Sequence, residues 1–420
     1  MVDAYPHRVR DPIHGFIHFS EEERRIIDSR EFQRLRFVGQ LALTYYVYPG
    51  AMHTRFEHSL GVMEMATRVF ENICSKSGDL VSQSLKQIDL TIDAARKVLR
   101  LAALLHDIGH LPFSHGGEVI LPKGTKHEDV SIAIIDYLTE FIDGLIFEGA
   151  ANIAKLLIKK DQVIPELRFL KSILSGPVDA DRMDYLLRDS HHCGVSYGSF
   201  DHRRLIETLS TVPGNSGGLD LAVDQGGIHS IEALILARYY MFTQVYCHRT
   251  RRIYDIYLKE FMAKWKPDLE PLTNVVLYDD IVAINKLRFE ASDKKKLAYD
   301  IAQRICRRNN HSVIYETSEF ADARMVRDSI EIFNKLKGRY SDHDFIHDNE
   351  AKGTIHKFFV PGDENEGEEL LVLHKQRERL VTEESEIIRR IPKKFHVVRI
   401  YTDVKDGEVL HKLREEAGGR

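Results

Sequence analysis

The stretch LRLAALLHDIGHLPFSH, residues 99–115, determines the fold and the chemistry that we expect of this chain. Apolar side chains surround its first two turns, which is typical of a helix buried in a core, and the run is too short to cross a membrane. His106 and Asp107 follow directly, and Gly109 and Pro112 then predict the end of the helix. A buried imidazole beside a buried carboxylate is costly unless both are compensated, and a divalent cation compensates both. The stretch therefore predicts a metal site at the end of a core helix.

Two further motifs carry residues of the same kind. An adjacent His-Asp pair alone also fits a helix end that is capped by a hydrogen-bonded pair. However, His58 lies upstream in HTRFEHSLG and Asp181 lies downstream in DADRMDY. With His106 and Asp107 they form a mixed nitrogen and oxygen set, which suits a Mn, Fe, Mg, Ni or Zn ion with open positions for water and substrate. We therefore predict that a divalent metal ion binds His58, His106, Asp107 and Asp181.

These motifs together resemble those of the HD-domain phosphohydrolases. More narrowly, the chain resembles the branch of deoxynucleoside triphosphate (dNTP) triphosphohydrolases that contains the vertebrate enzyme with a sterile-alpha-motif domain and its bacterial relatives. The matching segments are DPIHG (11–15), IIDSREFQRLR (26–36), HTRFEHSLGV (53–62), HDIGHLPFSH (106–115), KHE (126–128) and DADRMDY (179–185). The C-terminal part of the chain carries no comparable motif. The resemblance implies a helical fold and the hydrolysis of a dNTP to a deoxynucleoside and triphosphate, with a metal ion at the four residues above.

The resemblance also places three further histidines in the catalytic pocket. His110, His115 and His127 have the chemistry to donate to phosphate oxygens near neutral pH, and one of them can protonate a leaving oxygen. We expect His115 to protonate the departing 5′ oxygen, with His110 and His127 as supporting groups. Arg55 stands three residues before His58, so helical spacing puts both on one face and a phosphate could bridge them. A surface pair of this arginine with a glutamate is the alternative.

Tyr185 and Asp189 follow Asp181 at helical spacing, so one face carries a metal ligand, a phenol and a carboxylate. The resemblance implies that Asp189 accepts from a 3′ hydroxyl and that Tyr185 crowds the 2′ position, which disfavours ribonucleotides. The other residues that it assigns to sugar, base or phosphate are Gln40, Leu41, Arg182, Arg238 and Tyr246.

A possible regulatory site lies near the N-terminus. From the residues alone, Asp28, Gln33 and Arg36 form an ordinary solvated helical face. In the dNTP triphosphohydrolase branch these residue types recognise guanine, because a carboxylate accepts from N1 and N2 while arginine and glutamine meet O6 and N7. The resemblance therefore implies activation by a guanine nucleotide, dGTP or GTP, and assembly into a homotetramer or a dimer.

Composition limits the other possibilities. The chain has 420 residues, a net charge of −5 and four cysteines without CxxC spacing. There is no global basic field, so nucleic acid is not an expected partner and a phosphate site must be built locally. The scattered cysteines predict reduced thiols in a cytoplasmic protein. No signal peptide or long apolar run is present, so neither secretion nor a membrane span is expected.

The predicted fold is mainly α. We expect an HD phosphohydrolase domain over residues 1–266 and a smaller α+β subdomain over residues 267–420, which would support oligomerisation. Within the subdomain the pattern predicts helices at 294–309 and 321–337, and strands that begin near residues 312, 356, 370 and 396.

Two other functions remain open from the sequence. The same metal site could serve a nucleotidase or phosphodiesterase that acts on nucleoside monophosphates or signalling nucleotides. A nucleotide-sensing scaffold without activity is the other alternative. It is less well supported because every ligand position is filled.

Overall fold

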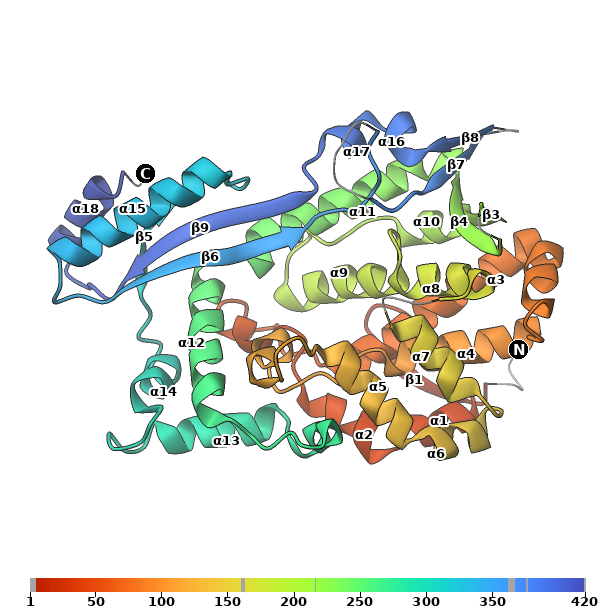
Figure 1. Cartoon of the computed structure of the whole chain (residues 1–420), viewed down its shortest axis with the longest axis horizontal. Coiled ribbons are helices and arrows are strands. Elements are labelled where there is room, and N and C mark those ends of the chain that lie inside the picture. Colours follow the sequence, from red (N-terminus) through yellow and green to blue (C-terminus); the bar gives the residue numbers. More distant parts are fainter. Residues whose placement is uncertain (1–4, 160–162, 216, 362–366, 375–376, 419–420) are drawn as a thin grey trace.

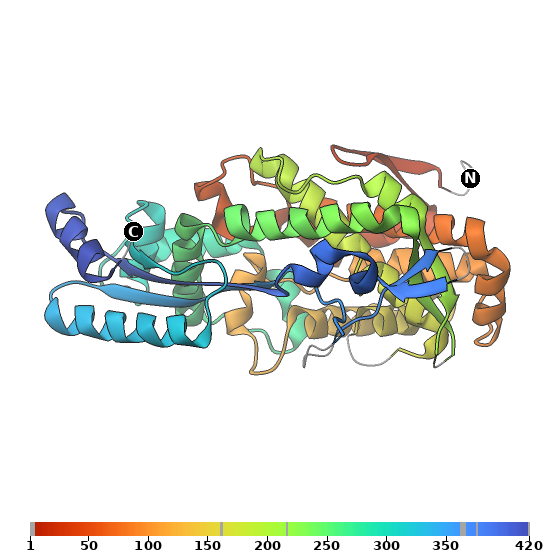
Figure 2. The same cartoon turned by 90° about the horizontal axis from the view of Figure 1, so that it is seen from above.

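The chain folds mainly into helices, as predicted, and Figure 1 shows their arrangement. The structure is a computed structural model that describes residues 5–159, 163–215, 217–361, 367–374 and 377–418. The first strand and the first long helices lie at one end of an elongated molecule, and the last helices lie at the other end in both views (Figures 1 and 2). Within the described ranges, none of the helices combines the length and the apolar character that crossing a bilayer requires.

The helical core is organised around α3 (Arg55–Lys86) and α4 (Ile92–Leu105), which pack against each other. Every residue of α4 from Val98 to Leu105 is buried, so the apolar run is a core helix as predicted. Its one charged residue in this run, Arg100, forms two hydrogen bonds of 2.5 and 2.8 Å with the buried carboxylate of Glu23. The other core helices are α5 (His127–Tyr137), α6 (Thr139–Leu145), α7 (Ala150–Ile158), α8 (Arg168–Ser175), α9 (Ala180–Cys193), α10 (His202–Thr208) and α11 (Ile228–Met241).

The N-terminal segment forms a hairpin and short helical turns along this core. Asp11 accepts the backbone amides of Ile13 (2.9 Å) and His14 (2.8 Å), and Gly15 takes a φ of +80°, so the DPIHG motif closes a tight turn. This turn places His14 in the interior. The elements are β1 (His7–Asp11), β2 (Gly15–Phe19), α1 (Glu21–Ile27), α2 (Arg30–Gln33), and the 3₁₀ turns η1 (Arg34–Phe37) and η2 (Ala42–Tyr46).

A break in the long helical segment after α11 matters for the site. The π-helical turn η7 (Phe242–Tyr246) separates α11 from α12 (Arg249–Trp265), and α12 runs in a different direction (Figure 1). A π turn shifts the register of the side chains that follow it, and such turns are frequent at functional sites. Here it lies at the cavity described below.

Two small sheets involve the C-terminal region. In the first, β3 (Leu209–Pro213), β4 (Leu219–Asp224), β7 (Leu371–His374) and β8 (Arg377–Leu380) pair in this order. In the second, β9 (Lys394–Thr402) lies between β5 (Ser312–Glu316) and β6 (Phe345–Thr354), and β6 and β9 form a long antiparallel ribbon (Figure 2). The accompanying helices are α13 (Asp280–Glu290), α14 (Tyr299–Cys306), α15 (Ala323–Arg339), α16 (Val381–Glu384), α17 (Glu386–Arg390) and α18 (Gly407–Glu416).

Some C-terminal predictions were wrong in detail. The strand expected near residue 356 is absent from the described segment, where Phe358 makes only a single bridge to Glu368, and β6 lies earlier in the chain. Helix α13 was missed because its apolar residues do not share one face: Ala283 and Leu287 are buried, whereas Phe289 is exposed. The strands at 312, 370 and 396 and the two predicted helices are confirmed, with α14 shorter than expected.

The C-terminal region packs into the same core as the earlier helices. Parallel pairing of β4 with β7 joins residues 219–224 to residues 371–374, and Val372 and Val397 belong to the core cluster that contains α3 and α4. The division of the chain at residue 266 stays a prediction, because its two parts share this core.

A close contact between α3 and α9 gives a test of the packing. A β-carbon added at Gly61 would lie 2.0 Å from Asp184 Oδ1 and 2.3 Å from Arg188 Nη2. We expect Gly61→Ala to lower the free energy of unfolding by about 1–3 kcal/mol or more, because the helices must separate to admit the methyl group. Denaturant unfolding followed by circular dichroism measures this change.

Gly78→Ala on the same helix is the matched control, since a β-carbon there meets nothing within 4 Å. Its stability should stay within about 1 kcal/mol of the native chain, on the stabilising side, because alanine has the higher helix propensity. Equal unfolding curves for the two variants would contradict the tight approach of α3 and α9.

Candidate metal centre and substrate cavity

The four predicted metal ligands converge from three helices. His58 lies in the first turn of α3, His106 and Asp107 end α4, and Asp181 lies in the first turn of α9. His58 Nε2 lies 3.1 Å from Asp181 Oδ1 and 3.6 Å from Asp107 Oδ2. His106 Nε2 lies 3.4 Å from Asp107 Oδ1 and 3.9 Å from Asp181 Oδ1. Ligand atoms that bind one ion at about 2.1 Å lie about 3–4 Å apart. His58, His106 and Asp107 each offer one atom within 4.8 Å of the other two, and Asp181 Oδ1 lies close to both imidazoles, so the four residues suit a single centre.

The orientation of the two imidazoles also fits a metal ion. His58 Nδ1 donates to Asp184 Oδ2 at 2.8 Å, and His106 Nδ1 donates to the carbonyl of Ala103 at 2.8 Å. Both Nε2 atoms are buried and have no hydrogen-bond partner among the described residues. A buried polar atom without a partner is costly, and metal-binding histidines commonly donate their other ring nitrogen to a carboxylate or carbonyl. His58, His106, Asp107 and Asp181 could therefore hold a divalent ion.

The charges around the centre favour a cation. Burial alone would lower the pKa of His58, but the carboxylates of Asp181 and Asp184 outweigh it and raise that pKa to about 10. Burial opposes ionisation of Asp107 as well, yet Arg55 and the neighbouring imidazoles hold the pKa of this carboxyl well below its usual value. The site thus stabilises positive charge beside His58, whether a proton or a metal ion carries it.

A buried carboxylate behind the ligands was missed by the sequence reasoning. Asp184 accepts from His58, from His14 Nε2 (2.6 Å) and from Arg188 through two bonds of 2.9 Å. Arg188 also donates to Asp11 at 2.8 Å. Burial raises the pKa of Asp184, but Arg188 and the two histidines together hold it well below its usual value. The available signal was the position of Asp184 in DADRMDY, three residues after Asp181.

The three predicted catalytic histidines lie together beside the metal centre. His110 is buried, stacks on His127 with ring centroids 3.9 Å apart, and lies 3.3 Å from Asp107 Oδ1. Glu118 Oε1 accepts from Nδ1 of both His115 and His127 at 2.7 Å. Burial, Arg55 and His127 lower the pKa of His110 well below its usual value, so this ring is neutral near pH 7. The side chain of His115 is 69% exposed, which leaves it free to meet a ligand.

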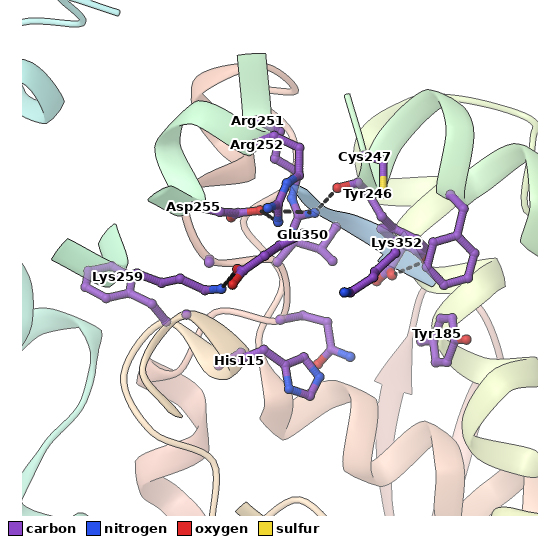
Figure 3. A pocket seen from close by; sticks show the side chains of 18 of the residues that line it. His115, Tyr185, Tyr246, Cys247, Arg251, Arg252, Asp255, Lys259, Glu350 and Lys352 are labelled. Carbon is purple, nitrogen blue, oxygen red and sulfur yellow. Dashed lines mark hydrogen bonds and ion pairs between the residues drawn. The ribbon is translucent and has the colours of Figure 1, made fainter. Parts of the chain in front are cut away.

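A cavity of about 460 Å³ opens onto the metal centre. Figure 3 shows His115 facing it from one side, with Arg251 and Arg252 across the space. Its lining contains the predicted residues Gln40, Leu41, Arg55, His115, Asp181, Tyr185, Asp189, Arg238 and Tyr246.

One wall of the cavity carries a fixed carboxylate. Asp189 accepts from His53 Nε2 at 2.7 Å and from the Tyr246 hydroxyl at 2.6 Å. Tyr185 and Tyr246 contact each other edge to face, with centroids 6.3 Å apart. Burial and the Asp189 carboxylate raise the pKa of Tyr246 well above its usual value, so its hydroxyl stays a donor.

A group of cations that lines the cavity was not predicted and is called the basic wall here. It includes Arg251, Arg252, Lys259 and Lys352, of which Arg252 forms two bonds with Asp348 (2.9 and 3.1 Å). Lys259 pairs with Glu350 (Figure 3). Lys352 has no carboxylate within 4 Å in the described part of the chain, and Arg238 Nε is buried without a partner there. The lysine comes from β6, which the sequence did not predict.

Some predicted residues lie outside the cavity. Arg182 donates to Asp179 (2.7 Å) and to the carbonyl of Gly176, and it is not among the lining residues. Asp28, Gln33 and Arg36 lie at the surface around α2. There Arg36 donates to Gln33 (2.8 Å) and Asp28 pairs with Arg24.

Known protein families match most of the helical part of the chain. The HD domain family matches residues 55–186, and the HD associated region matches residues 200–337. A hypothetical protein from Aquifex aeolicus has a similar structure, with a TM-score of 0.77, 31% identity, and coverage of 98% of this chain and 99% of its own. A phosphohydrolase from Bacteroides thetaiotaomicron gives a TM-score of 0.71 and 25% identity, covering 94% of this chain and 99% of its own.

The curated relatives are longer proteins. An uncharacterized protein of Methanocaldococcus jannaschii is 38% identical over 316 residues, which is 74% of this chain and 60% of the relative. The deoxynucleoside triphosphate triphosphohydrolase SAMHD1 of Xenopus laevis is 28% identical over 373 residues, 76% of this chain and 57% of the relative. The chain therefore spans less than two thirds of these two relatives.

The buried Asp184 gives a test of the centre that leaves the four ligands in place. We expect Asp184→Asn to weaken Mn²⁺ binding by about 10- to 100-fold, because His58 loses the charged partner that orients its ring. Titration calorimetry measures this affinity. Glu207→Gln, at a side chain that is 70% exposed, is the control and should bind as the native chain does. Native affinity in Asp184→Asn would contradict the orienting role.

Proposed function

Because this chain belongs to the HD-domain phosphohydrolase family, related to the dNTP triphosphohydrolase branch, we propose that it hydrolyses a dNTP to a deoxynucleoside and triphosphate. The observation that carries the proposal is a cavity whose wall contains Asp181, one of the four candidate ligands, together with a fixed carboxylate and several cations. A volume of about 460 Å³ lies within the range of small-ligand pockets.

The metal centre would supply the hydrolytic chemistry. His58, His106, Asp107 and Asp181 would hold a divalent ion, which would activate water and polarise a phosphoryl oxygen. Arg55 donates to Asp107 at 2.5 Å and to Ser114 at 3.0 Å, so its guanidinium is fixed at the cavity beside the centre. From there it would neutralise charge on the α-phosphate.

The remaining phosphates would lie toward the basic wall. Arg238 and Lys352 have donors without carboxylate partners among the described residues, which suits them to polyphosphate oxygens. His115 would protonate the departing 5′ oxygen, with its ring held by Glu118. His110 and His127 would complete the donor set. Arg182 is not included, because its guanidinium is paired away from the cavity.

The sugar would lie against the wall of Asp189. A carboxylate has about four acceptor sites, so Asp189 can accept from a 3′ hydroxyl in addition to His53 and Tyr246. Tyr185 would crowd a 2′ hydroxyl, while Gln40 and Leu41 would meet the base. This arrangement supports a deoxynucleotide over a ribonucleotide.

We also propose that a guanine nucleotide activates the enzyme at Asp28, Gln33 and Arg36. A second cavity of about 380 Å³ supports a further anion site. It is lined by four cations without a carboxylate within 4 Å in the described ranges, and these are Arg249, Arg308, Lys405 and Arg414. In an oligomer the guanine-binding surface of one subunit and this basic cavity of another would share the activator, with residues 267–420 contributing to assembly.

Product analysis tests the reaction. With Mn²⁺, each dNTP should yield a deoxynucleoside and inorganic triphosphate in equal amounts, detected by ion-exchange chromatography. Asp181→Asn should lower the rate at least a hundredfold, because it removes a metal ligand and its charge. Asp328→Asn, at an exposed residue of α15, is the matched control and should keep the native rate.

Other products would select other functions. Turnover of nucleoside monophosphates or signalling nucleotides, with none of any dNTP, would replace the proposal with the nucleotidase or phosphodiesterase. Nucleotide binding without any turnover would replace it with the nucleotide-sensing scaffold.

The activator site predicts a separate effect. Adding dGTP or GTP should raise the rate, and Asp28→Asn should increase the concentration for half-maximal activation about tenfold or more, because guanine loses a charged acceptor. Arg308→Met should have the same effect if the basic cavity shares the activator. Asp89→Asn, at an exposed residue between α3 and α4 that belongs to neither site, is the control. A native activation curve for Asp28→Asn would exclude this residue from the site.

A further inference from the structure

Arg34 is a buried cation that the chemistry above does not use. It lies in η1, is 5% exposed, and forms no ion pair within 4 Å among the described residues. Its guanidinium donates instead to three backbone carbonyls: Nη2 to Ile108 and to His110, each at 2.8 Å, and Nη1 to Tyr278 at 3.0 Å. Burial lowers the pKa of Arg34 to about 10, so it remains charged at neutral pH.

Two of the three carbonyls that Arg34 binds belong to the turn that carries the candidate metal ligands. Ile108 directly follows Asp107, and His110 is the stacked histidine of the catalytic cluster. Both carbonyls lie in the turn beyond α4, which ends at Leu105, and a buried backbone carbonyl needs a donor. Arg34 therefore fixes the turn that directly follows Asp107. A lysine could not bind these carbonyls in the same way, because the planar guanidinium presents several donors in a rigid fork.

A carboxylate holds the same turn from the other side. Asp280, the first residue of α13, accepts the amide of Phe113 at 2.6 Å and that of Gly39 at 2.9 Å. Phe113 and Ser114 have φ values of 61° and 54°, an uncommon conformation for residues with side chains. Such backbone persists only where its surroundings enforce it. The turn is thus held at both ends by side chains from outside it.

We propose that Arg34 is a positioning residue, which fixes the turn after Asp107 for metal binding and connects that turn to the surface around Gln33 and Arg36. Gln33 and Arg36 flank Arg34 in the chain, and Arg36 donates to Gln33 at 2.8 Å. A ligand that displaces this short segment must also move the guanidinium between them. The positioning role depends on the metal centre alone, whereas the connection rests on the activator site proposed above.

Arg34→Met and Arg34→Lys test the positioning role by calorimetric titration with Mn²⁺. We expect Arg34→Met to weaken binding by about 10- to 100-fold, the usual effect of removing a group that supports metal ligands. Arg34→Lys should recover part of this loss, because lysine keeps the positive charge but lacks the planar set of donors of the guanidinium. Arg30→Met, at an exposed residue of α2, is the control and should bind as the native chain does. In Arg34→Met the kcat for the hydrolysed nucleotide should fall together with the Mn²⁺ affinity, while the KM for that nucleotide changes less than threefold.

The outcomes of these titrations distinguish the positioning role of Arg34 from its connection to the activator site. Native Mn²⁺ affinity in folded Arg34→Met would overturn the proposal, and if that variant does not fold, native affinity in Arg34→Lys would do so. Because coupling between two ligands is reciprocal, a guanine nucleotide should tighten Mn²⁺ binding to the native chain and not to Arg34→Lys. An equal effect on both proteins, or none on the native chain, would overturn the connection. Mn²⁺ binding is measured without substrate, so failure of the dNTP reaction would leave this test intact.

Discussion

Asp184 carries a negative charge inside the helical core, and burying such a charge without partners would cost several kcal/mol. Here Arg188, His14 and His58 all donate to it, so one carboxylate joins α3, α9 and the N-terminal hairpin. The close approach at Gly61 exists because these helices must bring the imidazole and the carboxylate within hydrogen-bond distance. The hydrogen bond from His58 Nδ1 to Asp184 turns the other ring nitrogen, Nε2, toward the candidate metal centre. Packing of the core and orientation of the ligand are therefore consequences of one buried ionic network.

The turn after α4 depends on a second set of constraints. Residues 106–115 supply two of the candidate metal ligands and two of the proposed catalytic histidines within a short irregular segment, whose internal backbone hydrogen bonds include those from His110 to Asp107 and from Ser114 to Leu111. Its geometry is set by side chains from elsewhere: Arg34 on its early carbonyls, Asp280 on the amide of Phe113, and Arg55 on Ser114. Each of these groups comes from a different part of the chain. The conformation of this turn is thus set by hydrogen bonds from three other segments of the chain, so a change in any of these three side chains is expected to alter the candidate metal ligands.

The difference between residues in local motifs and residues in long-range contacts explains what could be predicted from the sequence. The four candidate metal ligands could be proposed because they lie in compact His- and Asp-containing motifs that resemble those of a known family, and the core helix that precedes His106 was visible from its apolar run. Asp184 could not be found in this way, since its partners at positions 14 and 58 are distant in sequence and its chemistry is that of any acidic residue. Lys352 was missed for another reason, because β6 has no clear alternation of apolar and polar residues. The fold class followed from local patterns, whereas the supporting network is a property of tertiary contacts.

The charge distribution is compatible with the proposed polyphosphate substrate although the chain as a whole is acidic. The net charge of −5 gives no overall attraction for anions, so binding must come from local excess. The main cavity is lined by six arginine and lysine residues and four carboxylates, and the carboxylates are not free to cancel all of the cations. Asp189 is held by His53 and Tyr246, and Asp181 faces the metal centre, so both act on groups other than the basic wall. Asp255 and Glu350 pair with Arg252 and Lys259 of the basic wall, whereas Lys352 has no carboxylate within 4 Å in the described part of the chain, so the cavity keeps a local excess of positive charge apart from Asp181. A substrate with a neutral sugar and a polyanionic tail beside a divalent ion matches this separation better than a neutral or purely apolar ligand would.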